Sequence, residues 1–92
     1  MKTFLMFGKA SPKELKEIGL KYKAEVVNLM GNFGGDVMSI YVMLRESYMV
    51  LILAFPEMSK AIKASAALSK LTGISFRIRP AVPVEELHML MV

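Results

Sequence analysis

The feature that most constrains the fold of this chain is a pair of apolar segments that lie three residues apart. Val37–Leu44 and Tyr48–Phe55 flank Arg45-Glu46-Ser47, a pattern typical of two β-strands joined as a hairpin. A hairpin with one face in water alternates apolar and polar residues, and this one barely does. Both faces therefore need cover. Because a chain of 92 residues has too little mass to cover both, we expect a partner chain or a ligand on the second face.

The composition predicts one folded domain over residues 1–92. Hydrophobic residues make up 54% of the chain and the mean hydropathy is +0.45, which excludes disorder and favours oligomerisation. A membrane span needs about 18 consecutive apolar residues, and Arg45 interrupts the longest candidate. The first residues show no signal-peptide pattern. We therefore expect no membrane association and a cytoplasmic protein.

Charge and cysteine content narrow the chemistry further. The chain has no cysteine, which excludes disulfides and thiolate sites and is compatible with a reducing cytoplasm. The net charge of +4 would tolerate an anionic ligand but is not a nucleic-acid signature. Ferredoxin-like RNA binders place aromatic residues on an open sheet with a basic surround. Here the lysines of the two predicted helices lie on the opposite side, so we do not expect nucleic-acid binding.

The remaining segments predict two more strands and two main helices. Strands are expected at Lys2–Phe7 and Ile74–Arg79, and a last helical turn or two at Val84–Met91. Ser11-Pro12-Lys13-Glu14 forms a capping box with proline at the first helical position, so a helix should begin there and end near Met30, before a glycine-rich turn. A second helix is expected from Glu57 to Leu71, with Gly73 just past its end. The order β-α-β-β-α-β predicts an α+β, ferredoxin-like fold, in which two helices cover one face of a four-stranded antiparallel sheet.

Apolar residues at helical spacing predict which helix faces meet the sheet. The first stripe comprises Leu15, Ile18, Tyr22, Val26, Leu29 and Met30. The second comprises Met58, Ala61, Ile62, Ser65, Leu68 and Thr72.

The uncovered face of the sheet follows from the register of the hairpin. If the two strands pair symmetrically about Glu46, the side covered by helices holds Met38, Ile40, Val42, Leu44, Tyr48, Val50, Ile52 and Ala54. The open side then holds Val37, Ser39, Tyr41, Met43, Met49, Leu51, Leu53 and Phe55. A slip of one residue exchanges the two sets of the second hairpin strand. From the open side we predict an oligomer interface made of Ser39, Met43, Met49, Leu51 and Leu53.

Four polar side chains are candidate ligand-binding residues. The last strand adds Ser75, Arg77 and Arg79 to the open side. The two arginines carry forked donors that suit a carboxylate or phosphate. Tyr41 and Tyr48 could orient a ligand through their hydroxyls. A solvated strand edge, ion pairs between subunits and simple packing are the structural alternatives.

The other candidate residues give weaker support for a functional site. His88 is the single histidine, and with Glu85 and Glu86 as its nearest acids a structural role is favoured over acid–base catalysis. No spacing typical of metal ligands exists, so we predict no metal site, no catalytic residue and no cofactor. The glycine-rich stretch Gly31–Gly35 follows a helix instead of opening one, which indicates a turn and not a phosphate loop.

Short motifs along the whole chain resemble one family. They are Gly34-Gly35 with Val37 and Tyr41, Leu44, Tyr48 with Val50, Pro56-Glu57, Gly73, and Ala81 with Glu85-Glu86-Leu87. Together with the element order, they resemble the GYD domain proteins, small and largely uncharacterised proteins related to the dimeric α/β-barrel group. Of the glycine-x-tyrosine-aspartate motif that names the family, this chain retains Tyr48, within Glu46-Ser47-Tyr48-Met49. The resemblance implies the fold and a homodimer, without implying a reaction.

Three functions stay open at this point. The first is a non-enzymatic oligomeric module that binds a partner or a small ligand between paired sheets. The second is an enzyme of the dimeric α/β-barrel type, such as a cofactor-independent monooxygenase, acting on a small hydrophobic or aromatic substrate. The third is an effector-sensing regulatory module. An enzyme needs a polar group aimed into an enclosed pocket, whereas a packing module needs only a filled interface.

Overall fold

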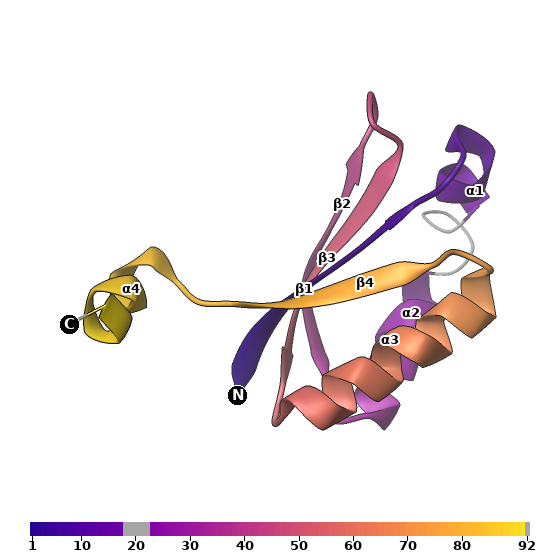
Figure 1. Cartoon of the computed structure of the whole chain (residues 1–92). Helices are drawn as coiled ribbons and strands as arrows, with labels where there is room; N and C mark the ends of the chain where they lie inside the picture. The colour runs from indigo at the N-terminus through magenta and orange to yellow at the C-terminus, as the bar shows by residue number, and fades with distance from the viewer. Residues whose placement is uncertain (18–22, 92) are drawn as a thin grey trace.

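The chain folds around a single antiparallel sheet. The structure, a computed structural model, describes residues 1–17 and 23–91, with side chains as far as residue 87. In chain order the elements are β1 (Lys2–Lys9), α1 (Pro12–Glu17), α2 (Lys23–Asn32), β2 (Asp36–Met43), β3 (Tyr48–Phe55), α3 (Met58–Thr72), β4 (Phe76–Ala81) and α4 (Val84–Met91) (Figure 1).

The four strands lie in the order β2-β3-β1-β4, and each neighbouring pair is antiparallel. With α2 and α3 on one face, this is the predicted α+β arrangement, and its strand order fits the ferredoxin-like fold. The predicted single helix from Ser11 to Met30 is described in two parts, α1 and α2. Ile18 and Tyr22, predicted for its apolar stripe, lie outside the described residues.

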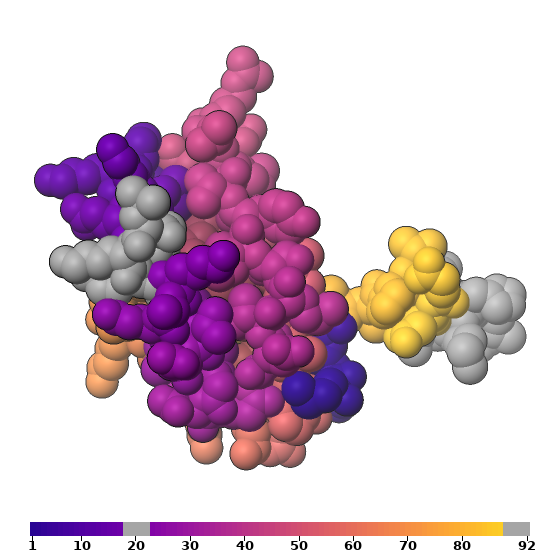
Figure 2. Space-filling model, turned by 180° about the vertical axis from the view of Figure 1, so that it is seen from behind, coloured from indigo at the N-terminus to yellow at the C-terminus, as the bar shows by residue number. Residues whose placement is uncertain are grey.

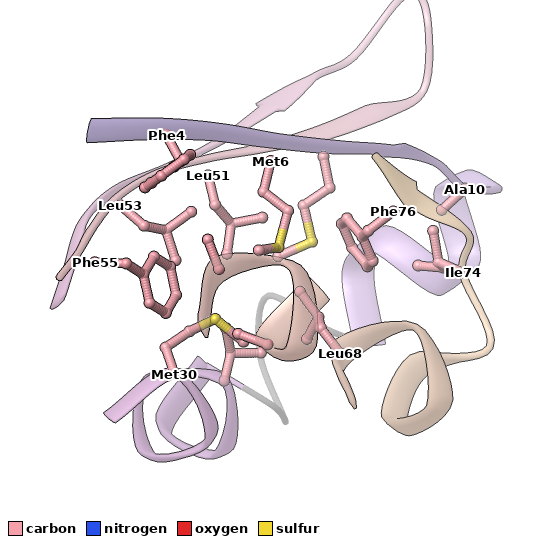
Figure 3. Close-up of a cluster of buried hydrophobic side chains, with 14 of the residues drawn as sticks. Phe4, Met6, Ala10, Met30, Leu51, Leu53, Phe55, Leu68, Ile74 and Phe76 are labelled. Atoms are coloured by element: carbon pink, nitrogen blue, oxygen red, sulfur yellow. The ribbon is translucent and has the colours of Figure 1, made fainter. Parts of the chain in front are cut away.

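The hydrophobic core lies between the sheet and the helices (Figure 3). In this view the labelled core side chains of β1 and β3 point toward α3 and α2. The largest fully buried side chains are Phe4, Phe55, Met6, Met30, Met49, Leu51, Leu53, Leu68 and Val26. The helix stripes therefore contribute largely as predicted, except that Met58 and Ile62 of α3 are exposed.

Local hydrogen bonds define the ends of the helices. The backbone N–H of Glu14 donates to Ser11 Oγ at 3.2 Å, and the N–H of Ser11 donates to Glu14 Oε1 at 3.1 Å, so the predicted capping box is confirmed. At the end of α2, Gly35 donates to the carbonyl of Met30 and Gly34 to that of Gly31. These two bonds form a Schellman motif. Its left-handed residue is Gly34, with φ of 77°.

The register of the hairpin differs from the predicted one by a residue. Met43 pairs with Tyr48, so four residues, Leu44 to Ser47, form the turn in place of three. Ser47 has φ of 56°, and a left-handed residue is a common way to close such a loop. A bulge also interrupts β2 between Val37 and Ser39. The turn exchanges the two faces of β3, and the bulge turns Val37, predicted for the open side, toward the core, whereas Met38, predicted for the covered side, is 57% exposed.

The faces assigned to β3 from the sequence are therefore wrong. Met49, Leu51 and Leu53, predicted for the open side, are 2%, 0% and 0% exposed and lie in the core. Phe55 is buried with them. These side chains do not line the open face, because a slip of one residue in a strand moves its whole set to the other face.

No helix in the described ranges, 1–17 and 23–91, is long and apolar enough to cross a membrane.

Candidate functional site

The face of the sheet that no described helix covers has an apolar centre and a cationic edge. Strand pairing places four cross-strand rows on it. In order β2-β3-β1-β4, the rows are Asp36-Ala54-Thr3-Ala81, Ser39-Ile52-Leu5-Arg79, Tyr41-Val50-Phe7-Arg77, and Met43-Tyr48-Lys9 from the first three strands. We call this surface the open face. Its centre is half-buried and its β4 edge carries both arginines.

A hollow of about 270 Å³ lies at one end of the open face. It is lined by Phe7, Lys9, Tyr48, Ser75 and Arg77. The rings of Phe7 and Tyr48 lie 6.4 Å apart and are tilted by 56°, an aromatic pair that forms one apolar wall. We call this feature the cationic hollow.

The electrostatics of the cationic hollow favour an anion. Lys9 and Arg77 bring two positive charges, while Tyr48 and Ser75 bring two hydroxyls that can donate hydrogen bonds. None of its described lining residues is acidic. Arg77 can pair with a carboxylate or phosphate through two parallel N–H groups, so the site suits a small ligand with one anionic group and an apolar body.

The volume of the cationic hollow is small for a complete ligand site. Ligand pockets typically enclose about 300–1,000 Å³ and bury most of the ligand. A hollow of about 270 Å³ on an uncovered sheet face leaves one side of any ligand in water. A second surface laid over the open face would complete the enclosure.

The structure brings together only part of the predicted ligand set. Tyr48 and Arg77 line the same hollow. Tyr41, 59% exposed, lies on β2 at the opposite edge of the sheet, about 14 Å from the Arg77 strand at the usual spacing between strands. Arg79 follows two positions along β4, and its guanidinium donates to the carbonyl of Ile78 at 2.9 Å.

Ser39 and Met43, predicted for an oligomer interface, do lie on the open face by the strand pairing. Their role in an interface stays a prediction. Of that predicted set, only these two offer side chains to a partner through this face.

Sequence reasoning missed Phe7 and Lys9, whereas it placed Ser75 on the open side of the last strand without giving it a role. The predicted first strand ended at Phe7, whereas β1 continues to Lys9, and alternation from Leu5 through Phe7 would have placed Lys9 on the open face. For β3, the hydroxyl of Tyr48 was the signal in the sequence that could have predicted which set of side chains faces solvent. A tyrosine keeps its polar end wet, which favours the open side for Tyr48 and the core for Met49.

A second hollow, of about 280 Å³, lies between α1 and the tip of the hairpin. Its described lining is mostly apolar and consists of Pro12, Leu15, Lys16, Val42, Leu44 and Ser47. Lys16 is the one ionisable group among these side chains. This hollow has room for a hydrophobic group, but its described lining has few polar side chains that could react with that group.

Among the residues with described side chains, no three His, Cys, Asp or Glu residues gather closely enough to hold a metal ion. The side chain of His88 lies outside the described residues, so its predicted structural role stays a prediction. Comparison with known proteins gives no further assignment: the sequence matches no protein-family model and no curated protein.

Proposed function

We propose that this protein is a non-enzymatic binding module, in which two copies pair through their open faces and hold a small anionic ligand between the sheets. The observation that carries the proposal is the cationic hollow, where Lys9 and Arg77 lie beside the ring pair of Phe7 and Tyr48. The ligand class is a small aromatic or apolar carboxylate. The resemblance to the GYD domain proteins, and with it kinship to the dimeric α/β-barrel group, belongs to this proposal.

Pairing through the open face is supported by the apolar centre of that surface. Leu5, Phe7, Val50 and Ile52 are neighbours in two adjacent rows, and none belongs to the core cluster. Each large apolar side chain that becomes buried contributes about 1.5–3 kcal/mol before the entropy of association is subtracted. A partner copy would bury these side chains and close the cationic hollow in the same step.

The test of ligand binding uses benzoate as the probe and calorimetry as the readout. Arg77→Gln removes the forked donor, so we expect the dissociation constant for benzoate to rise at least tenfold, as for the loss of a charge-assisted hydrogen bond. Lys63→Gln, an equal change on the exposed outer surface of α3, is the matched control and should leave binding unchanged.

Benzyl alcohol, which keeps the ring and lacks the anion, should bind more weakly than benzoate to the unmodified protein. Equal affinity of Arg77→Gln and the unmodified protein for benzoate would reject the proposed site. A native mass spectrum of protein purified from its own host then gives the mass of any retained ligand.

An enzyme of the dimeric α/β-barrel type is the second candidate. The observation in its favour is the apolar hollow between α1 and the hairpin tip, which has room for a small hydrophobic substrate. It ranks second because Lys16 is the single described group there that could transfer a proton. An effector-sensing module would use the same cationic hollow as the binding module and differ only in its output.

A further inference from the structure

The C-terminal helix α4 stands apart from the body of its own chain. Figure 1 shows it beyond the end of the sheet, joined to β4 by an extended connector, and in Figure 2 its coloured first turn projects from the rest of the surface. Val84 is 81% exposed and Leu87 is 45% exposed, although both are apolar. A hollow of about 400 Å³ lies at the connector, between the start of β1 and the first turn of α4. The side chains of α4 that the structure describes, from Val84 to Leu87, are therefore exposed, and Glu86 lines the hollow at the connector.

The connector explains why α4 does not fold back over the open face of its own chain. Ala81 ends β4 opposite Thr3, near the beginning of β1 and thus at one end of the sheet. Pro80 and Pro83 bracket the connector, and the proline rings restrict the backbone to extended conformations. The chain leaves the sheet along the strand direction, and α4 begins beyond it.

The charges of α4 complement the opposite end of the open face. Its first turn carries Glu85 and Glu86. We call the end of the open face that carries Lys9 and Arg77 the cationic end. Arg77 lies about 13 Å from Ala81 along β4 at the usual rise per residue. The acidic turn therefore lies far from Lys9 and Arg77 of its own chain, and the cation of its own chain that it approaches is Lys2, which lines the connector hollow together with Glu86.

In a dimer whose two-fold axis runs across the strands, the acidic turn of one chain would lie against the cationic end of the other chain. Two sheets paired about such an axis place the Ala81 end of each chain over the Arg77 end of its partner. An axis along the strands would instead place α4 near Asp36, which pairs with Ala54 at the Ala81 end of the sheet. Glu85 would then meet a like charge, so electrostatic complementarity favours the first arrangement.

From these observations we infer that α4 is an exchanged arm, which packs on the open face of a second copy of this chain with Glu85 and Glu86 against the partner copy's cationic end. This inference rests on the dimer of the proposed function, and it makes the carboxylates of the arm and the anionic ligand alternative occupants of Lys9 and Arg77. A stable interface buries about 800 Å² of accessible surface per partner. The exposed Val84 and Leu87 of two exchanged arms would add apolar area to that of the paired sheets.

Disulfide trapping between two different single-cysteine chains tests the arm directly, since the natural chain has no cysteine. One chain carries Glu85→Cys in the arm, and the other, given a mass tag, carries Ser75→Cys at the rim of the cationic hollow. We expect the mixed pair to form an interchain disulfide under mild oxidation. Asp36→Cys at the other end of the sheet and Ser59→Cys on the exposed surface of α3 are matched partners that should not be trapped.

The dissociation constant of the dimer, measured by sedimentation equilibrium, tests the exchanged arm separately from the existence of the dimer. Deletion of residues 84–92 should raise it at least tenfold, and so should Glu85→Lys with Glu86→Lys. Mixing that charge-reversed chain with Arg77→Glu should restore part of the affinity. Unchanged dimer affinity after the deletion, or trapping at Asp36→Cys in preference to Ser75→Cys, overturns the arm and leaves the dimer standing. An unmodified chain that is monomeric at every concentration overturns the dimer and the arm together.

Discussion

At the scale of single residues, two glycines differ in whether the structure has room for a side chain at their position. Gly8 is buried in β1 where the start of β4 approaches closely. A Cβ at this position would lie 2.8 Å from Ile74 Cγ2, 3.0 Å from Phe76 Cδ1 and 3.1 Å from the carbonyl oxygen of Ser75. Gly31, within α2, has open space around the same position. Gly8 is required by packing, whereas Gly31 is only a weak helix former.

The Gly8→Ala variant should therefore be less stable by about 1–3 kcal/mol, because the added methyl group overpacks the contact between β1 and β4. Gly31→Ala should change the free energy of unfolding in the opposite direction, by about 0.5–1 kcal/mol, since alanine is the better helix former. Urea unfolding of both variants measures the two changes. A neutral Gly8→Ala would mean that β4 can move away from β1 at little cost.

At the scale of elements, hydroxyl groups attach the second half of α3 to the start of β4. Ser65 is 5% exposed, and its Oγ donates to the carbonyl of Phe76 at 3.3 Å. The backbone N–H of Phe76 donates to Ser69 Oγ at 3.0 Å, and Ser69 in turn donates to the carbonyl of Ser65. Thr72 accepts from the N–H of Ile74. These bonds position β4, and with it Arg77.

Removing one of these hydroxyls should loosen β4. Ser69→Ala leaves the N–H of Phe76 without its partner, so we expect a loss of about 1–2 kcal/mol in the free energy of unfolding. Ser59→Ala in the exposed first turn of α3 is the matched control and should stay within about 0.5 kcal/mol of the unmodified protein. Faster hydrogen exchange at the Phe76 amide in Ser69→Ala alone would locate the effect. Equal stability of the two variants would contradict it.

At the scale of the whole molecule, the sheet has one covered and one open face, as the apolar hairpin led us to expect. The covered face holds the core, and the open face keeps a half-buried apolar centre between Tyr41 on one edge and Arg77 on the other. Such a surface is a common mark of association between proteins. The proposed dimer accounts for both the apolar centre and the incomplete cationic hollow.

An acidic residue at the centre of the open face should prevent that association. Ile52→Asp would bury an unpaired carboxylate in the dimer, so we expect the variant to be monomeric at concentrations where the unmodified chain is dimeric. Ile62→Asp is the matched control, because Ile62 is 51% exposed on α3 and away from the proposed interface. Light scattering after size-exclusion chromatography measures both. A dimeric Ile52→Asp variant would place the interface elsewhere.

Local signals in the sequence were sufficient for the elements and the fold class. The capping box of Ser11 and Glu14, the end of α2 at a glycine pair and the position of Gly73, with φ of 76° after α3, depend on residues within one helical turn of each other. The order of strands and helices then left the ferredoxin-like arrangement as the expected topology. These features were predictable because their causes lie close together along the chain.

Only the tertiary structure decided which face of the hairpin is buried and which side chains share a site. Both sets of alternate residues in β3 are apolar, so their hydrophobicity could not choose between Leu51 and Ile52. The four-residue turn to β2 and the pairing of β3 with β1 made that choice. The pairing of β1 with β3 and with β4 brought Tyr48 to the side of Lys9 and Arg77, residues that lie far apart in the chain. The sequence determined that a second face would need cover, whereas the pairing of the strands determined which residues that face presents.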